Sequence, residues 1–440
     1  MLKAQKLTLA VLVNAALISS AYASEQSEAK GFVEGASASV LLRNGYISRD
    51  AKNVVPASNK VTDTSSWLQS VMLNLESGFT QGPVGFAAGV VGDFSFKLGD
   101  NYHAGNSMIA LKHDGAVENG RVDPYDQWTR GGGYVKARAS NTTLTYGTQI
   151  LDLPVLASMT TRNVPEYFEG TLITSHEIKN LEVVAGKFTK NQLPEHIASD
   201  QNHLDRAYVW GAKYQFNDQL KAAYYGADLK DKLERHYANV NYKQTLANKD
   251  SLTYDFSGYH TKFEPGTTYS ATGPADEDKK NNIWAVSATY NTGPHTAMLA
   301  YQQNTGNVGY DYGQNGDGGQ SIYLPNSYLS DFIGNHEKSV QLQYTYDFAD
   351  LAVPGLSWTT AYVYGWDIHT KDSNNNLVDD NAQESEFFNQ VSYKVQTGPA
   401  KDLNIRVRNS IYRNDQSYAN QYIPDTNEWR IFVDFPIKFF

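Results

Sequence analysis

The chain has 440 residues, with 47 acidic and 37 basic side chains and a formal net charge of −10. This acidic balance argues against nucleic acid as a partner. The sequence contains no cysteine, which excludes disulfides, thiolate metal sites and cysteine nucleophiles.

The first 23 residues have the three parts of a secretory signal peptide. Lys3 and Lys6 precede an apolar run at 7–18, and small residues follow at 21–23. We expect cleavage after Ala23, which leaves residues 24–440 as a single barrel domain. An uncleaved anchor is the alternative, but the apolar run is too short to span a bilayer, and no later stretch approaches about 20 consecutive apolar residues.

From residue 32 onward the sequence reads as one strand after another, joined alternately by short turns and long polar loops. Asn217-Asp218 and Gly398-Pro399 are typical of the turns. The longest loops are expected at about 98–130 and 305–336. The eighteen expected strands lie at about 32–47, 66–78, 83–97, 131–139, 142–150, 171–178, 181–190, 206–216, 219–228, 234–245, 251–262, 282–291, 295–304, 337–348, 356–367, 384–396, 400–414 and 425–440.

Apolar and polar residues alternate in these strands, as where Trp429 and Ile431 oppose Arg430 and Asp434. A soluble β-sandwich would show the same period. The even strand count, the export signal and the aromatic final strand at 435–440 favour a membrane instead. We predict an all-β fold, a transmembrane antiparallel β-barrel of eighteen strands in the outer membrane of a Gram-negative bacterium. A barrel of this size leaves an aqueous pore, and aromatic girdles would use many of the thirty tyrosines.

Residues 151–170 match neither of the strands beside them. Pro154 and Pro165 remove backbone donors, so this stretch cannot join a sheet ladder, yet it is too apolar for an exposed loop. We expect it to fold against the inside wall of the barrel and to set the width of the pore.

Basic residues occupy the polar face of several strands. An arginine facing lipid near the midplane would cost about 2–4 kcal/mol, so these side chains should point into the lumen. Together with Arg162 of the inserted loop they would form a positive track that lowers the electrostatic barrier for a carboxylate. For any one of them the alternative is a structural ion pair that holds the loop in place. The strand residues are Arg43, Lys136, Arg138, Arg406, Arg408 and Arg430.

The loop at about 305–336 is also more apolar than an exposed loop should be, especially over 318–332. Folded inward, Asp331 would place one negative charge opposite the positive track. A loop packed on the rim of the barrel is the alternative.

Catalytic motifs are missing from the sequence. There is no Gly-x-Ser-x-Gly elbow, no His-Glu-x-x-His and no phosphate-binding loop, and the glycines at 131–133 begin a strand rather than a helix. The sequence therefore predicts neither an enzyme nor a cofactor nor a metal site.

The order and spacing of short motifs resemble the OprD family of outer-membrane carboxylate channels, over essentially the whole mature chain. The motifs are Leu41-Leu42-Arg43-Asn44 with Arg49-Asp50, Ser77 to Gly82, Val135 to Arg138, Leu153-Pro154-Val155 with Arg162 and Pro165, Tyr214 to Asp218, Ser321 to Leu324 with Ser330-Asp331-Phe332, Gly398 to Leu403, Arg406-Val407-Arg408, and Asn427 to Arg430.

This resemblance implies an eighteen-stranded barrel narrowed by its third and seventh loops. It also implies a basic ladder made of the seven residues above, and passive uptake of small carboxylates such as basic amino acids and aromatic acids, with carbapenem antibiotics as passengers. Ser327 and Asp331 correspond to polar groups at the constriction. The expected constriction residues are therefore Ser327, Tyr328 and Asp331.

Several positions depart from the family's pattern. Ala361 and Ser392 stand where the family would have a lumen arginine and lysine, so the track should be thinner here. Tyr328 is displaced relative to the expected constriction tyrosine, and Gln320 replaces an acid.

We predict a carboxylate-selective diffusion channel that works without catalysis or cofactor. A general diffusion porin, an outer-membrane hydrolase and a surface adhesin with a closed lumen are the alternatives. The expected partners are outer-membrane lipid, lipopolysaccharide and small carboxylate solutes, with the protein a monomer or a weak homotrimer.

Overall fold

The computed structural model describes residues 24–52, 63–112, 121–200, 204–265, 279–312, 321–372 and 376–440. The expected signal peptide, residues 1–23, lies outside this range, so cleavage after Ala23 stays a prediction. Position 320 also lies outside it. Within the described ranges, no helix has the length and apolar character needed to cross a membrane.

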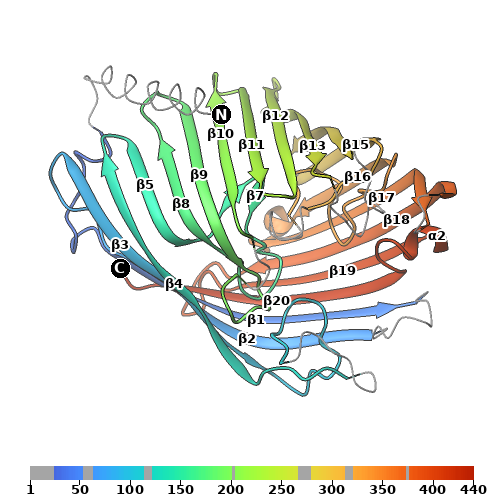
Figure 1. Cartoon of the computed structure of the whole chain (residues 1–440), viewed down its shortest axis with the longest axis horizontal. Helices are drawn as coiled ribbons and strands as arrows, with labels where there is room; N and C mark the ends of the chain where they lie inside the picture. The colour runs from blue at the N-terminus through green and yellow to red at the C-terminus, as the bar shows by residue number, and fades with distance from the viewer. Residues whose placement is uncertain are drawn as a thin grey trace.

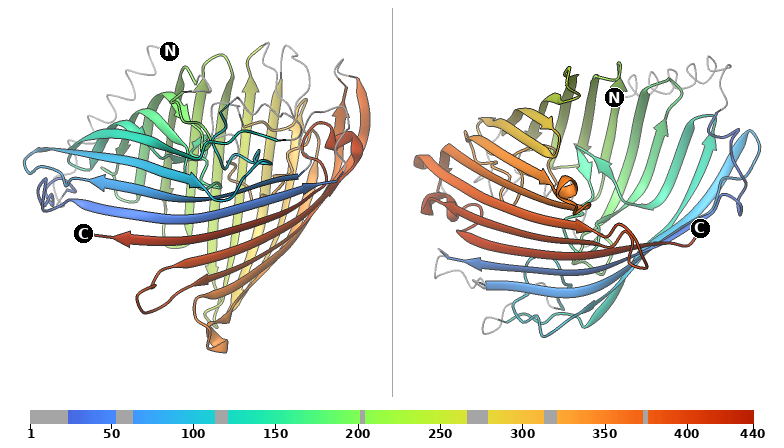
Figure 2. Two further views of the ribbon diagram at one scale, coloured as in Figure 1. Left: turned by 90° about the horizontal axis from the view of Figure 1, so that it is seen from below. Right: turned by 180° about the vertical axis from the view of Figure 1, so that it is seen from behind.

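Over the described chain, eighteen antiparallel strands form one closed sheet, which confirms the predicted barrel (Figures 1 and 2). The ring closes where β1 pairs with both β2 and β20. The strands are β1 (Ser37–Ala51), β2 (Asp63–Glu76), β3 (Val84–Lys97), β4 (Gln127–Ala139), β5 (Thr142–Gln149), β8 (Tyr167–Ser175), β9 (Leu181–Gln192), β10 (Ala207–Gln215), β11 (Leu220–Leu229), β12 (Leu233–Thr245), β13 (Ser251–Phe263), β14 (Lys280–Thr292), β15 (His295–Gly306), β16 (Lys338–Asp347), β17 (Leu356–Lys371), β18 (Leu377–Lys394), β19 (Asn404–Asn414) and β20 (Thr426–Lys438).

Four short elements of the described chain lie outside this ring. The strands β6 (Asp152–Leu153) and β7 (Leu156–Ala157) form a small hairpin that projects inside the barrel (Figure 1). A 3-10 helix, η1 (Phe348–Leu351), makes one turn, and α2 (Gln416–Ala419) lies in the loop before β20.

Several strand ends differ from expectation, and three strand starts show why. The first strand begins at Ser37 rather than 32, because Gly35 packs so closely on Gly78 that a Cβ at Gly35 would lie 2.9 Å from the Gly78 Cα. The fourth strand begins at Gln127, four residues early, and β18 begins at Leu377, seven residues early. Both extensions are mainly polar, so they lack the apolar alternation on which the prediction relied.

The two faces of the wall differ as the alternation predicted. Trp429 is 50% exposed on the outer face, whereas the neighbouring Arg430 is 5% exposed on the inner face. Trp210 and Val209 show the same contrast on the opposite side of the barrel. Apolar side chains therefore face lipid on the outside, while the inner face carries polar side chains such as Arg430 and, where loops pack on it, apolar ones such as Val209.

Inward-folded loops fill much of the lumen. The third loop (residues 150–166) and the described parts of the seventh loop (residues 307–312 and 321–337) pack against the inner faces of β8 to β14 in one apolar core. Residues 151–166 therefore fold against the wall as expected, whereas 167–170 belong to the wall itself, because they pair in the ladder of β8. The described parts of the seventh loop also lie inside rather than on the rim. The shared core includes Leu151, Leu153, Val155, Leu156, Phe188, Tyr225, Tyr259, Val308, Tyr310, Leu324 and Ile333.

The described parts of the second loop (residues 98–112 and 121–126) make more apolar contacts than the sequence suggested. Met108 and Ile109 are buried in a separate core with Ile47 of β1 and Leu68 of β2. Asn106 joins this core to the barrel, since its Nδ2 donates to the Ile47 carbonyl at 3.2 Å. All three long loops thus narrow the same lumen.

Candidate functional site

The third and seventh loops meet inside the barrel. The hydroxyl of Tyr323, in the seventh loop, donates to the carboxylate of Asp152, in the third. Tyr259 of β13 joins both, because its hydroxyl donates to the Pro154 carbonyl at 3.1 Å and accepts from the Tyr323 backbone N–H at 3.0 Å. The two loops therefore form one joined wall of the pore.

Arg130 of β4 fastens the third loop to the barrel. Its guanidinium forms a fully buried ion pair with Asp93 of β3 at 2.8 Å, and it donates to the backbone carbonyls of Pro165 and Leu193 at 2.7 and 2.6 Å. Arg130 was not predicted as a site residue, because the strand was expected to begin at Gly131, one residue later. The even spacing between Arg130 and Lys136, which places both on the same face of the strand, is the signal that would have identified Arg130.

Glu166, at the end of the third loop, is completely buried. Its carboxylate accepts from the Met159 backbone N–H at 3.0 Å and from the Asn191 amide at 2.8 Å. Burial raises the pKa of Glu166 to about 8. The role of Glu166 was not predicted, because one acid in an irregular loop creates no periodic pattern.

Two track residues near β20 have acidic partners. Arg43 of β1 pairs with Asp434 at 2.6 Å. Arg430 pairs with Glu428 at 2.5 Å, and Arg49 donates to the same carboxylate at 2.7 Å. The positive charges of Arg43 and Arg430 are therefore partly neutralised inside the barrel.

Lys136 and Arg138 lie near the end of the barrel that carries the short turns. The Lys136 ammonium pairs with Glu76 at 2.7 Å. The Arg138 guanidinium stacks over the Phe79 ring at 3.9 Å and lies 3.7 Å from the Glu25 carboxylate. Lys136 and Arg138 thus lie away from the inserted loops, near the end of β4.

Arg162 is buried, with 1% of its surface exposed. Its Nε donates to the Asn106 carbonyl of the second loop at 2.7 Å, and its own carbonyl accepts from Arg43 at 3.2 Å. Burial and the nearby Arg430 and Arg49 lower the pKa of Arg162. Arg162 therefore joins the second and third loops to β1.

Arg406 and Arg408 on β19 differ from the other track residues. Among the described residues the Arg406 side chain forms no hydrogen bond or ion pair. Its guanidinium lies 5.4 Å from the centroid of the Phe432 ring. Nε and Nη2 of Arg408 are buried and also lack a hydrogen-bond partner in the described chain. Arg43 contacts the same Phe432 ring at 5.5 Å, so two guanidiniums meet at one aromatic side chain, while Arg408 lies over the Phe388 ring at 4.9 Å.

Tyr328 lies against the barrel wall beside Arg408. Its ring stacks on Phe388 with a centroid distance of 4.0 Å, and Arg408 lies 4.9 Å from the Phe388 centroid. The Tyr328 hydroxyl donates to Gln343 at 2.6 Å and accepts from Gln341 at 2.7 Å. The structure therefore places Tyr328 beside the positive track, and its hydroxyl both donates and accepts a hydrogen bond.

Asp331 is buried in the seventh loop rather than exposed to the lumen. Its carboxylate accepts from the hydroxyls of Ser327 and Tyr312. Burial and two nearby carboxylates, Glu386 and Glu384, raise the pKa of Asp331 to about 8. Asp331 thus carries little negative charge near neutral pH.

Two glutamates of β18 hold the seventh loop to the wall. The Glu386 carboxylate accepts from the backbone N–H groups of Leu329 and Ser330, both at 3.0 Å. Glu384 accepts from the Ser330 hydroxyl at 2.7 Å. The sequence analysis did not select either acid, although both fall on the inner face of a strand.

The two positions at which the family would have a lumen arginine and lysine lie inside the barrel. Ala361 of β17 is buried beside Phe388 of β18. Ser392 of β18 lies directly opposite Arg406, and its hydroxyl donates to Asn404 at 3.1 Å. A lysine at 392 would repel Arg406, so serine leaves that guanidinium without a like charge across the strand pair.

Comparison with known proteins identifies the family. The profile described as "outer membrane porin, OprD family" matches residues 30–439. The chain belongs to the OprD family of outer-membrane porins. Members of this family are channels for small solutes in the outer membrane of Gram-negative bacteria, and they are not enzymes.

Three relatives match this chain over nearly their full length. Porin D of Pseudomonas aeruginosa is 36% identical, over 96% of this chain and 95% of Porin D. The crystal structure of Acinetobacter baumannii OccAB1 is 64% identical, with a TM-score of 0.88 over 95% of this chain and all of OccAB1. That of Pseudomonas aeruginosa OpdK with vanillate is 25% identical, with a TM-score of 0.78 over 93% of this chain and all of OpdK.

Proposed function

We propose that this OprD-family channel selects small solutes that bear a carboxylate. The observation that carries the proposal is the pair Arg406 and Arg408, whose guanidiniums have no acidic hydrogen-bond partner among the described residues. A guanidinium buried without such a partner binds a carboxylate strongly, often through two parallel hydrogen bonds.

The spacing of the two residues suits transfer of an anion. Arg406 and Arg408 are two positions apart on the inner face of one strand, so their Cα atoms lie about 7 Å apart along that strand. A carboxylate that leaves one guanidinium therefore has a second guanidinium nearby on the same strand. Arg43, beside Arg406, extends the positive potential although its own charge is shared with Asp434.

The proposed solutes are amino acids, aromatic acids and, as passengers, carbapenem antibiotics, all of which carry a carboxylate. The vanillate in the OpdK structure, an aromatic acid, supports the aromatic class. Because Asp331 is mainly protonated at neutral pH, it attracts the positively charged side chain of a basic amino acid less strongly than the sequence suggested. Every residue of the proposed track comes from one chain, so a monomer suffices, whether or not copies associate weakly as trimers.

A general diffusion porin is the second candidate, and the ion pairs of Arg43, Lys136 and Arg430 favour it. In a general porin these pairs would be structural and the pore would pass anions and neutral solutes alike. The two candidates differ only in whether Arg406 and Arg408 bind the carboxylate of a passing solute.

The reversal potential of single channels in a potassium benzoate gradient tests the proposal. We expect the wild type to prefer benzoate over potassium, and the Arg406→Gln/Arg408→Gln variant to lose that preference. The control, Lys187→Gln/Lys338→Gln, removes two positive charges from the outer face of the wall and should leave the preference unchanged. A wild type with no benzoate preference would support the general porin instead.

A further inference from the structure

The barrel wall has a gap in its strand pairing where the third loop leaves it. β3 pairs with β4 from Gln127 to Ala139, but β5 pairs with β4 only from Tyr134 to Ala139. Residues 127–133 of β4 therefore have a strand partner on one edge only. Backbone groups left unpaired in a membrane wall need a polar partner, because hydrocarbon offers none.

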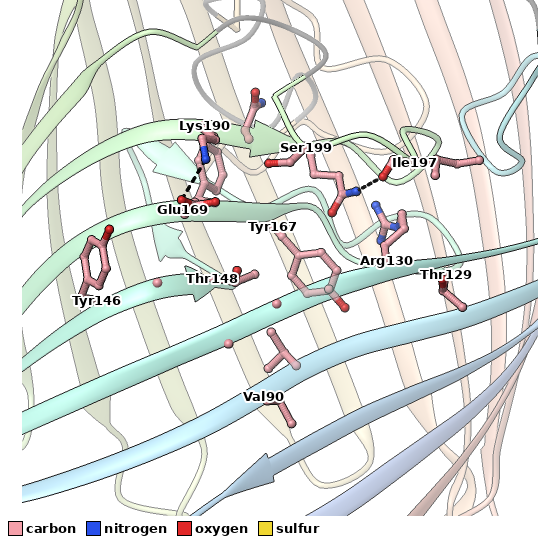
Figure 3. A pocket seen from close by; sticks show the side chains of 18 residues that line it. Val90, Thr129, Arg130, Tyr146, Thr148, Tyr167, Glu169, Lys190, Ile197 and Ser199 are labelled. Carbon is pink, nitrogen blue, oxygen red and sulfur yellow. Dashed lines mark hydrogen bonds and ion pairs between the residues drawn. The ribbon is translucent and has the colours of Figure 1, made fainter.

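A cavity of about 880 Å³ lies at this gap, as Figure 3 shows. On the lipid-facing side it is lined by Val90 and Tyr146, which are 44% and 56% exposed. On the inner side it reaches Arg130, Tyr167 and Asn191. The cavity thus extends from the outer surface of the barrel to the residues that anchor the third loop.

Glycines at 131–133 create the space. Gly131 has a φ of +134°, and its Cβ would lie 2.3 Å from the Val91 carbonyl oxygen, so the backbone itself requires glycine there. Gly133 has no such need, since the nearest atom to its Cβ would be 3.6 Å away. A side chain at Gly133 would instead project into the cavity, because Val135, on the same face, is exposed.

The lining combines apolar and hydrogen-bonding groups. Val90 and Tyr146 offer a surface for an acyl chain. The lining also includes Thr148 and Lys190, whose side chain is 44% exposed. The Lys190 ammonium pairs with Glu169 at 3.0 Å and has two further donor hydrogens. An amphiphile with an oxygen-rich headgroup matches both halves of the lining, whereas a small polar solute matches only one.

Asn191 supplies a second, independent observation. Its Nδ2 donates to Glu166 at 2.8 Å, which fixes the orientation of the amide. Its Oδ1 is buried and has no hydrogen-bond partner within the described part of the chain. A buried acceptor of this kind calls for a hydroxyl donor, which a sugar headgroup has and a simple phosphate group lacks.

We propose that this cavity binds the phosphorylated sugar headgroup of an outer-leaflet glycolipid. The acyl chain lies along Val90 and Tyr146, the phosphate accepts from Lys190, and a sugar hydroxyl donates to Asn191 Oδ1. The gap lies toward the end of the barrel that carries the long loops, which in outer-membrane barrels faces the outer leaflet. This site is independent of the proposed solute selectivity.

Native mass spectrometry of the full barrel in detergent tests the proposal, with a bisphosphorylated lipid A as probe and phosphatidylethanolamine as the competing lipid. We expect the wild type to retain one lipid A under conditions that remove phosphatidylethanolamine. Gly133→Trp should weaken that binding at least about tenfold. Val135→Trp, on the same outer face but outside the cavity lining, should bind as the wild type does.

Folding of each variant is checked by the heat-dependent shift of the barrel on an electrophoresis gel, with Gly133→Leu as substitute if the tryptophan variant does not fold. Equal retention of lipid A by the Gly133 and Val135 variants would overturn the site. Equal retention of phosphatidylethanolamine by the wild type would overturn the assignment to a glycolipid.

Discussion

Tyr323 and Asp152 join the two inserted loops through one hydrogen bond from a hydroxyl to a carboxylate. The bond links residues 171 positions apart in the sequence. The width of the channel therefore depends on a contact between two loops and not only on the barrel.

Replacing Tyr323 by phenylalanine tests this contact. Loss of a partly exposed hydrogen bond costs about 1 kcal/mol, which is about fivefold in the equilibrium between joined and separated loops. We expect more frequent open-state fluctuations in single-channel recordings, with the mean selectivity unchanged. Tyr362→Phe, at an exposed position on the outer wall, is the control, and identical noise in the two variants would contradict the account.

Replacing Arg130 by methionine should release the third loop. The change leaves Asp93 buried without its cation and removes the donors to Pro165 and Leu193. Breaking a buried ion pair by removing one partner costs about 3–5 kcal/mol. We expect a lower unfolding temperature on electrophoresis gels and a larger conductance. An Arg130→Met/Asp93→Leu double variant should recover part of the unfolding temperature but not the original conductance.

Asp331 predicts a dependence on pH. Its folded-state pKa, about 8, is raised from the ordinary value of 3.8, so the folded protein holds this proton more tightly than the unfolded chain does. The stabilisation is complete below about pH 4 and is lost as the pH rises to 8. We expect the difference in unfolding temperature between the wild type and Asp331→Asn to change steadily between pH 5 and 8. A constant difference would show that Asp331 is ionised throughout.

The expected signal peptide gives a direct prediction. Mass spectrometry of the protein purified from outer membranes should find Ser24 as the first residue. Recovery of a chain that begins at Met1 would contradict cleavage and favour the uncleaved anchor.

The barrel could be predicted from the sequence because each wall residue faces one of two solvents. Alternation such as that of Trp429 and Arg430 indicates which face meets lipid. The strand ends were less predictable where tertiary contacts decide them. The close packing of Gly35 on Gly78 delays the start of β1, and the first four residues of β4, 127–130, are too polar to show apolar alternation.

Predicting the site from sequence had a different limit. The positions of the basic residues on the inner face followed from strand parity, but their partners did not, because Asp434 lies 391 residues from Arg43. Sequence could therefore not separate the paired Arg43 and Lys136 from the unpaired Arg406. It also could not find Glu166, whose role depends on an irregular loop meeting a distant strand.

Uptake of gluconate and sorbitol into proteoliposomes tests the central claim most directly, because the two solutes share a carbon skeleton and differ in the carboxylate. We predict that wild-type channels admit gluconate several-fold faster than sorbitol, and that Arg406→Gln/Arg408→Gln channels admit both at similar rates. Equal rates through the wild type, or a preference for gluconate that survives the double substitution, would contradict the claim that these two arginines select carboxylates.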